Sequence, residues 1–153
     1  MNILVTYQSK TGFTKKYAQW ISEELRCDIK EISKVTQEDI KNHGLVIHGG
    51  WIMGGMINGL DKIRRFAPQK LIVFGVGFTM KEQMETAQCI SANKLGNTPF
   101  FYYEGGMNPE KMGFMGKMIV RMVTKKSPAY ADRTDQNEIK ELVKLALIFS
   151  SEA

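Results

Sequence analysis

The sequence predicts an α/β three-layer sandwich, in which helices cover both faces of a parallel sheet. Residues 3–5, 45–47 and 71–74 form continuous apolar runs rich in β-branched residues. Runs without alternation are typical of strands buried on both faces. Helical patterns and short connections separate these runs, which indicates βαβ units with right-handed crossovers. With 153 residues and no interdomain linker, we expect a single domain over residues 1–153.

After the first strand, the chain supplies one helix and a second strand. An amphipathic helix is predicted over residues 14–26, because four apolar residues recur there at helical spacing: Tyr17, Trp20, Ile21 and Leu25. Residues 27–32 alternate between apolar and charged, which suits a short second strand. The polar stretch 36–42 connects this strand to the buried run 45–47, and we expect at most a helical turn within it.

The second half continues the alternation of strands and helices. Three segments follow the run 45–47 in addition to the strand 71–74: a helix over 57–66, a helix over 81–93 and an aromatic strand over 99–103. The last helix opens near Asp135, and Glu138 stands three residues on, as in a capping box. Its buried stripe comprises Ile139, Leu142, Val143 and Ala146.

The turn at residues 9–14 has the composition of an anion site. It contains three hydroxyl side chains and a glycine, directly after the first strand and before the first helix. Ser9, Thr11 and Thr14 can donate hydrogen bonds, and Gly12 permits close approach of the backbone. The first N–H groups of the next helix also favour negative charge. We therefore expect a phosphate here, the alternative being an ordinary N-capping turn.

This turn matches the pattern [ST]-x-T-G-x-T and resembles the phosphate loop of flavodoxins, which bind flavin mononucleotide (FMN). The resemblance implies a five-stranded parallel sheet in the order 2-1-3-4-5, with the ligand at the carboxyl ends of strands 1 and 3. It also implies that the phosphate of FMN is held by the six residues of the turn: Ser9, Lys10, Thr11, Gly12, Phe13 and Thr14.

Two further turns are expected to reach the flavin ring at the same edge. The glycine-containing stretch 49–56 follows the third strand, and Gly50, Trp51, Ile52, Met53 and Gly54 would line one side of the ring. Trp51 either stacks on the ring or packs between sheet and helix. Gly77 and Phe78 would lie at the other edge of the ring. His48, a lone strand-end histidine, is more typical of a structural residue.

Segment 104–133 is longer than a simple connection and is both basic and rich in methionine. Six apolar residues fall at helical spacing: Met112, Met115, Met118, Ile119, Met122 and Val123. Five basic residues accompany them: Lys111, Lys117, Arg121, Lys125 and Lys126. We expect a helix with its methionines in the core and its lysines in water. The alternative is a surface that contacts an acidic membrane, or a flat apolar ligand with carboxylates.

The net charge of +5 and the pI of about 9.2 favour an anionic partner or surface. Nucleic acid is disfavoured, because aromatic residues are not interleaved with the basic ones. Cys27 and Cys89 show no metal or redox spacing and are expected to be free thiols. Motifs of zinc enzymes and P-loop NTPases are missing from the sequence. No secretory signal precedes the first strand, so we expect a cytoplasmic location.

The basic segment and the closing Thr134-Asp135 make the chain similar to one branch of this family, which includes menaquinone-dependent protoporphyrinogen dehydrogenase. Three functions therefore stay open. The first is electron transfer by bound FMN with a redox partner protein. The second is an FMN-dependent dehydrogenase that oxidises a porphyrinogen and reduces a quinone, with peripheral contact to the inner membrane surface. The third is a flavin-free binding module on the same fold.

Overall fold

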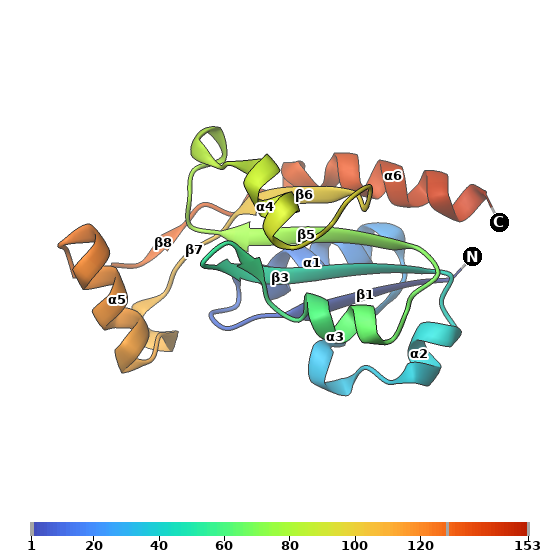
Figure 1. Cartoon of the computed structure of the whole chain (residues 1–153), viewed down its shortest axis with the longest axis horizontal. Coiled ribbons are helices and arrows are strands. Elements are labelled where there is room, and N and C mark those ends of the chain that lie inside the picture. Colours follow the sequence, from blue (N-terminus) through green and yellow to red (C-terminus); the bar gives the residue numbers. More distant parts are fainter. Residues whose placement is uncertain (1, 128, 153) are drawn as a thin grey trace.

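A computed structural model of the chain describes residues 2–127 and 129–152. Residues 1, 128 and 153 belong to the predicted domain, and residue 128 also to segment 104–133; they lie outside the described residues. Five strands form a parallel sheet in the order β2-β1-β3-β5-β6. Counting only these parallel strands, the order is the predicted 2-1-3-4-5 (Figure 1). They are β1 (Ile3–Gln8), β2 (Asp28–Glu31), β3 (Leu45–Met53), β5 (Leu71–Gly77) and β6 (Phe100–Glu104).

Helices cover both faces of the sheet (Figure 1). On one face lie α1 (Phe13–Leu25) and α6 (Lys140–Ser151), whose buried side chains share a core with the sheet. The other face is covered by α2 (Gln37–Lys41), α3 (Leu60–Arg65) and α4 (Thr86–Ala92). Short 3-10 helices complete the connections: η1 (Ile32–Lys34), η2 (Lys81–Gln83), η3 (Pro109–Lys111) and η4 (Gln136–Ile139).

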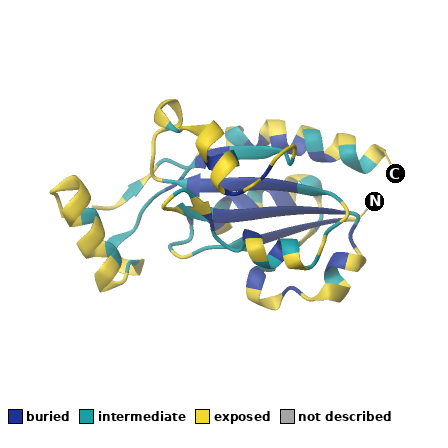
Figure 2. Cartoon of the chain, viewed as in Figure 1, coloured by how far each residue is buried: buried dark blue, intermediate teal, exposed yellow. Residues whose placement is uncertain are grey.

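The central strands are buried on both faces, as their continuous apolar runs predicted (Figure 2). In β1, Val5 packs in the core beneath α1 and α6, whereas its neighbour Leu4 packs on the opposite face. Ile47 and Val46 repeat this arrangement in β3. Because successive side chains of a strand point to opposite faces, such burial requires apolar residues at every position.

Several details of the elements differ from the sequence prediction, and α3 and α6 begin later than expected, at Leu60 and Lys140. β3 runs through the predicted glycine turn to Met53 and forms a hairpin with β4 (Met56–Ile57). Gly54 and Gly55 turn this hairpin with φ of +58° and +82°, values that glycine adopts readily. The predicted helix 81–93 is divided into η2 and the short α4. The predicted capping box is replaced: Asp135 accepts a hydrogen bond from Asn137 N, and Glu138 pairs with Lys81 at 2.6 Å.

The largest departure is the segment after β6, where β7 (Gly106–Met107) and β8 (Ala131–Asp132) form a small antiparallel ladder. They carry η3 and α5 (Phe114–Thr124) away from the sheet, at the left of Figure 1. We call residues 106–132 the arm. The expectation that its methionines lie in the core is wrong, because no residue of α5 is buried (Figure 2). The sheet is already covered by α1 and α6, so α5 has no core surface left to occupy.

Both cysteines are free, as expected, with Cys89 buried and Cys27 half-buried. Burial raises the pKa of the Cys27 thiol to about 11, so this side chain stays protonated at neutral pH. Within residues 2–127 and 129–152, no helix is both long and apolar enough to cross a bilayer.

His48 is a structural residue of the sheet. It is fully buried, and burial lowers its pKa from 6.5 to about 4. Nδ1 lies 2.9 Å from the Thr6 hydroxyl, and Nε2 lies 2.8 Å from the Asn58 carbonyl. A neutral ring satisfies both contacts, with Nε2–H donating to the carbonyl and Nδ1 accepting from the hydroxyl. The imidazole thus joins β1 and β3 to the chain that leads into α3.

We expect the free energy of unfolding to fall as the pH drops from about 6.5 towards about 4. The unfolded chain binds a proton at the ordinary pKa of histidine, whereas folded His48 resists it, so acid favours unfolding by up to about 3 kcal/mol. Denaturant unfolding at several pH values measures this loss. His48→Asn should show a weaker dependence on pH. A His48 ring signal that titrates near pH 6.5 by NMR in the folded wild type would contradict the assignment.

Candidate functional site

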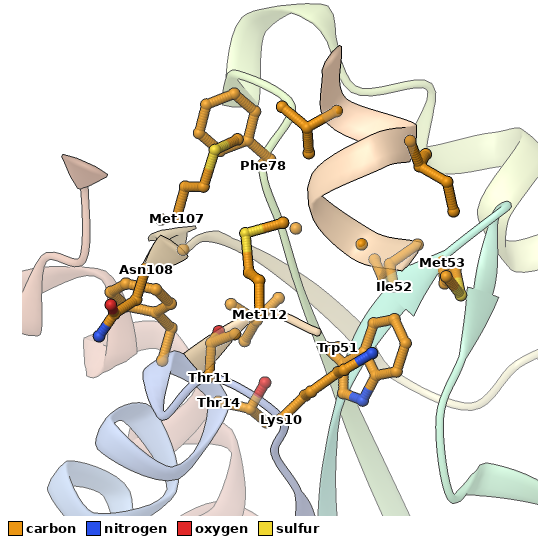
Figure 3. A pocket seen from close by; sticks show the side chains of 18 residues that line it. Lys10, Thr11, Thr14, Trp51, Ile52, Met53, Phe78, Met107, Asn108 and Met112 are labelled. Atoms are coloured by element: carbon orange, nitrogen blue, oxygen red, sulfur yellow. The ribbon is translucent and has the colours of Figure 1, made fainter. Parts of the chain in front are cut away.

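The candidate site is a cleft at the carboxyl edge of the sheet, between three strand ends and the arm (Figure 3). β1, β3 and β5 are neighbours and parallel, so the residues that follow them meet at one edge. Most of the predicted site residues line this cleft: Lys10, Thr11, Phe13, Thr14, Trp51, Ile52, Met53, Gly77 and Phe78. Ser9, Gly12, Gly50 and Gly54 do not line it.

Turn 9–14 leaves the N-terminus of α1 open. Gly12 is the N-cap residue with φ of +100°, and no side chain of the described residues caps the helix. Ser9 Oγ instead accepts a hydrogen bond from Gly12 N at 3.1 Å and so closes the turn. The first N–H groups of a helix have no acceptor within it, so these donors are available to an anion. Thr11 and Thr14 stand beside them in the cleft.

The end of β3 forms a second wall. An added Cβ on Gly50 would lie 2.1 Å from the Asn58 carbonyl oxygen, so Gly50 allows the hairpin to pack against the strand. Trp51, Ile52 and Met53 follow it into the cleft (Figure 3). Lys10 Nζ lies 5.7 Å from the centre of the Trp51 ring, which places a cation beside the indole. Gly54 lies at the exposed hairpin turn.

The end of β5 forms the third wall. Position 77 has room only for glycine, because an added Cβ would lie 2.8 Å from the Tyr102 hydroxyl. That hydroxyl donates to the Thr79 carbonyl at 2.6 Å and holds the turn after β5. The Phe78 ring faces the Arg133 guanidinium at 4.3 Å, and Arg133 also donates to the Phe78 carbonyl.

The arm supplies the remaining side of the cleft, which the sequence prediction missed. Two additional lining residues, Val76 and Gly105, precede the arm. The others belong to it: Gly106, Met107, Asn108, Met112, Gly116, Ile119 and Val120. Gly105 and Gly106 could have been found, since they follow the fifth strand of the predicted sheet at the same edge. Nothing in the sequence pattern showed that residues of α5 would line the same cleft as Trp51.

A group of contacts joins the base of the arm to the sheet and to α1. Tyr17 Oη donates to the Glu104 carbonyl at 2.5 Å and accepts from Asp135 N at 3.1 Å. Lys16 pairs with Asp132 at 2.9 Å, and Arg133 pairs with Glu104 at 2.9 Å. Burial raises the pKa of Tyr17 to about 12, so its hydroxyl remains a donor at neutral pH. The arm therefore leaves the domain at a defined point beside the cleft.

The chemistry of the lining is that of a binding site for a flat apolar group with an anionic tail. Aliphatic, thioether and aromatic side chains line the cleft, and the open end of α1 stands at one side. Among the residues that the structure describes, no His, Cys, Asp or Glu lines it. In the described part of the chain, no group of three such residues could hold a metal ion. The described lining thus offers apolar surface that can orient a flat ligand and exclude water from it.

Comparison with known proteins agrees with this geometry. A family model described as "Flavodoxin domain" matches residues 4–134. The oxidised Flavodoxin 2 of Bacillus cereus shares 17% identity, with all of each chain covered and a TM-score of 0.59. A putative flavoprotein of Bacteroides eggerthii shares 16% identity over 68% of this chain and 86% of its own, with a TM-score of 0.50. No curated protein is significantly similar in sequence.

Two buried tyrosines give a matched test of the anchor at the base of the arm. The rings of Tyr17 and Tyr103 stack at 4.8 Å, but among the described residues the Tyr103 hydroxyl has no hydrogen-bond partner. We expect Tyr17→Phe to lower the free energy of unfolding by about 1–3 kcal/mol, because it removes two part-buried hydrogen bonds, to the Glu104 carbonyl and from Asp135 N. Tyr103→Phe should leave it unchanged or raise it. Denaturant unfolding compares them, and equal losses in both variants would contradict the assigned roles.

Proposed function

Because the chain belongs to the flavodoxin family, its cofactor is FMN, and we propose that it is an electron-transfer protein that exchanges electrons with a redox partner protein. The observation that carries this proposal is the open N-terminus of α1 at Gly12, next to a cleft walled by apolar side chains. A phosphate and a flat ring joined by a short chain match these two neighbouring features. Bound FMN would supply the redox chemistry, and the residues of the chain would bind and orient it.

The assignment of roles follows from position. Thr11 and Thr14, with the first amides of α1, would hold the phosphate. Trp51, Ile52 and Met53 would cover one side of the ring, and Gly77 and Phe78 its far edge. Ser9, Gly12, Gly50 and Gly54 would act indirectly, because they shape the turns that carry the lining residues. Phe78 and Met53 are about half exposed, which leaves the rim of the cleft accessible to a partner protein.

A charge placed in turn 9–14 tests this proposal. The purified protein should bind FMN with quenching of flavin fluorescence. Thr11→Asp should weaken FMN binding at least about 100-fold, since a carboxylate would repel the phosphate, and should leave the affinity for riboflavin nearly unchanged. Thr36→Asp makes the same change at the N-cap of α2 and should affect neither ligand. Wild-type protein that binds no FMN would overturn the proposal and favour a flavin-free binding module.

A second candidate, the dehydrogenase that passes electrons from a porphyrinogen to a quinone, is favoured by the arm. Residues 111–131 contain five Lys and Arg and no acidic residue. The exposed fractions of Phe114, Met115 and Met122 are 75%, 66% and 73%. An apolar surface bordered by cations suits an anionic membrane, where a quinone resides, and also a flat substrate with carboxylates. Reduction of bound FMN by protoporphyrinogen, with reoxidation by a quinone, would distinguish this enzyme from a carrier.

Membrane contact by the arm is tested with vesicles. We expect the protein to co-sediment with vesicles that contain anionic lipid, more strongly than with zwitterionic vesicles and less at high salt. The double variant Met115→Ser/Met122→Ser should lose most of this binding, because its apolar contact area is reduced. Leu147→Ser, at an exposed apolar residue of α6, is the matched control. Binding that is equal in all three proteins would rule out α5 as the contact.

A further inference from the structure

Lys111 brings a positive charge to turn 9–14 from the arm. Its Nζ lies 3.8 Å from the point that a Cβ on Gly12 would occupy. Gly12 is the N-cap of α1, so this ammonium stands over the open end of the helix. Lys111 is the last residue of η3, one hundred residues away from the turn in sequence. In the sequence it is one of the five basic residues of segment 104–133.

The backbone around Lys111 is ordered by local hydrogen bonds. Asn108 Oδ1 accepts from Glu110 N at 3.2 Å, and Lys111 N donates to the Asn108 carbonyl at 3.1 Å. Asn108 and Met112, on either side of η3, line the same cleft as Thr11 (Figure 3). η3 therefore lies against the cleft, and the position of its lysine follows from contacts on both sides.

The charge on Lys111 lacks a partner in the described residues. No carboxylate of residues 2–127 and 129–152 lies within 4.0 Å of its Nζ. Lys16, in the first turns of α1, is by contrast neutralised by Asp132 at 2.9 Å. A cation next to a helix N-terminus is repelled by the helix dipole, because both are positive. An anion that lies between the ammonium and the helix N-terminus is attracted by both.

We propose that Lys111 binds the phosphate of FMN from the arm side and makes the site selective for the phosphorylated flavin. The inference rests on the proposed function, and it adds to turn 9–14 a ligand that the arm alone provides. The phosphate would lie between the amides of α1 and the ammonium. Binding of FMN would thereby also draw η3 towards the turn, so that the arm and the cofactor stabilise one another.

The affinities for FMN and for riboflavin separate this role from general packing. We expect Lys111→Met to weaken FMN binding about tenfold, because it removes one charge-assisted contact. Riboflavin, which has no phosphate, should bind wild type and variant with similar affinity. The salt dependence of FMN binding should also be shallower in the variant. Lys111→Arg should restore most of the affinity, and Lys117→Met, which removes a charge elsewhere on the arm, should behave as wild type.

The outcomes distinguish this inference from the function on which it rests. If wild type binds FMN and Lys111→Met binds it equally well, Lys111 is not a phosphate ligand and the electron-transfer proposal stands. If Lys111→Met weakens FMN and riboflavin alike, Lys111 acts through packing, and the inference is overturned. If wild type binds neither flavin, both proposals fail together.

Discussion

The two-sided burial of β1, β3 and β5 is the constraint on which the rest of the molecule depends. Val5, Ile47 and Phe74 face the helices α1 and α6, and Leu4, Val46 and Val73 face the opposite layer. Parallel strands buried in this way are joined by helical crossovers. All of them therefore start on the same side of the sheet, and their carboxyl ends lie together on the opposite side. The residues that follow the three strands are therefore brought to the same edge, although they are widely separated in sequence.

At that edge the molecule leaves polar groups open where an anion can use them. Inside the sheet, by contrast, the buried His48 ring bonds both the Thr6 hydroxyl and the Asn58 carbonyl. α1, in contrast, begins at Gly12 without a side-chain cap, directly beside Thr11 and Thr14. An uncapped helix end normally lowers stability, because four N–H groups lack acceptors. Its position at the strand ends is consistent with a cofactor that supplies the missing acceptor.

The arm adds lining residues to the cleft and leaves the five-stranded parallel sheet unchanged. Its base is joined to the domain through Tyr17, Asp132 and Arg133, all of which contact residues of the sheet edge or α1. Beyond this base, no residue of α5 is buried, and Gly116, Ile119 and Val120 line the cleft. A basic and apolar surface that projects beside a cofactor site would give a partner or membrane direct access to that site.

The sequence by itself determined the strands of the parallel sheet, because continuous apolar runs are local signals, and the resemblance of turn 9–14 to the flavodoxin loop supplied their order. Such runs indicate strands that are buried on both faces, and a hydroxyl-rich turn with a glycine before a helix predicts an anion site. Tertiary structure alone decided where α5 lies and which residues it brings to the cleft. An amphipathic stripe such as Met112 to Val123 indicates only that one side of a helix is apolar. It does not indicate which element covers that side. α1 and α6 cover the sheet face that α5 was expected to occupy, and the position of Lys111 near Gly12 depends on a fold that no local pattern encodes.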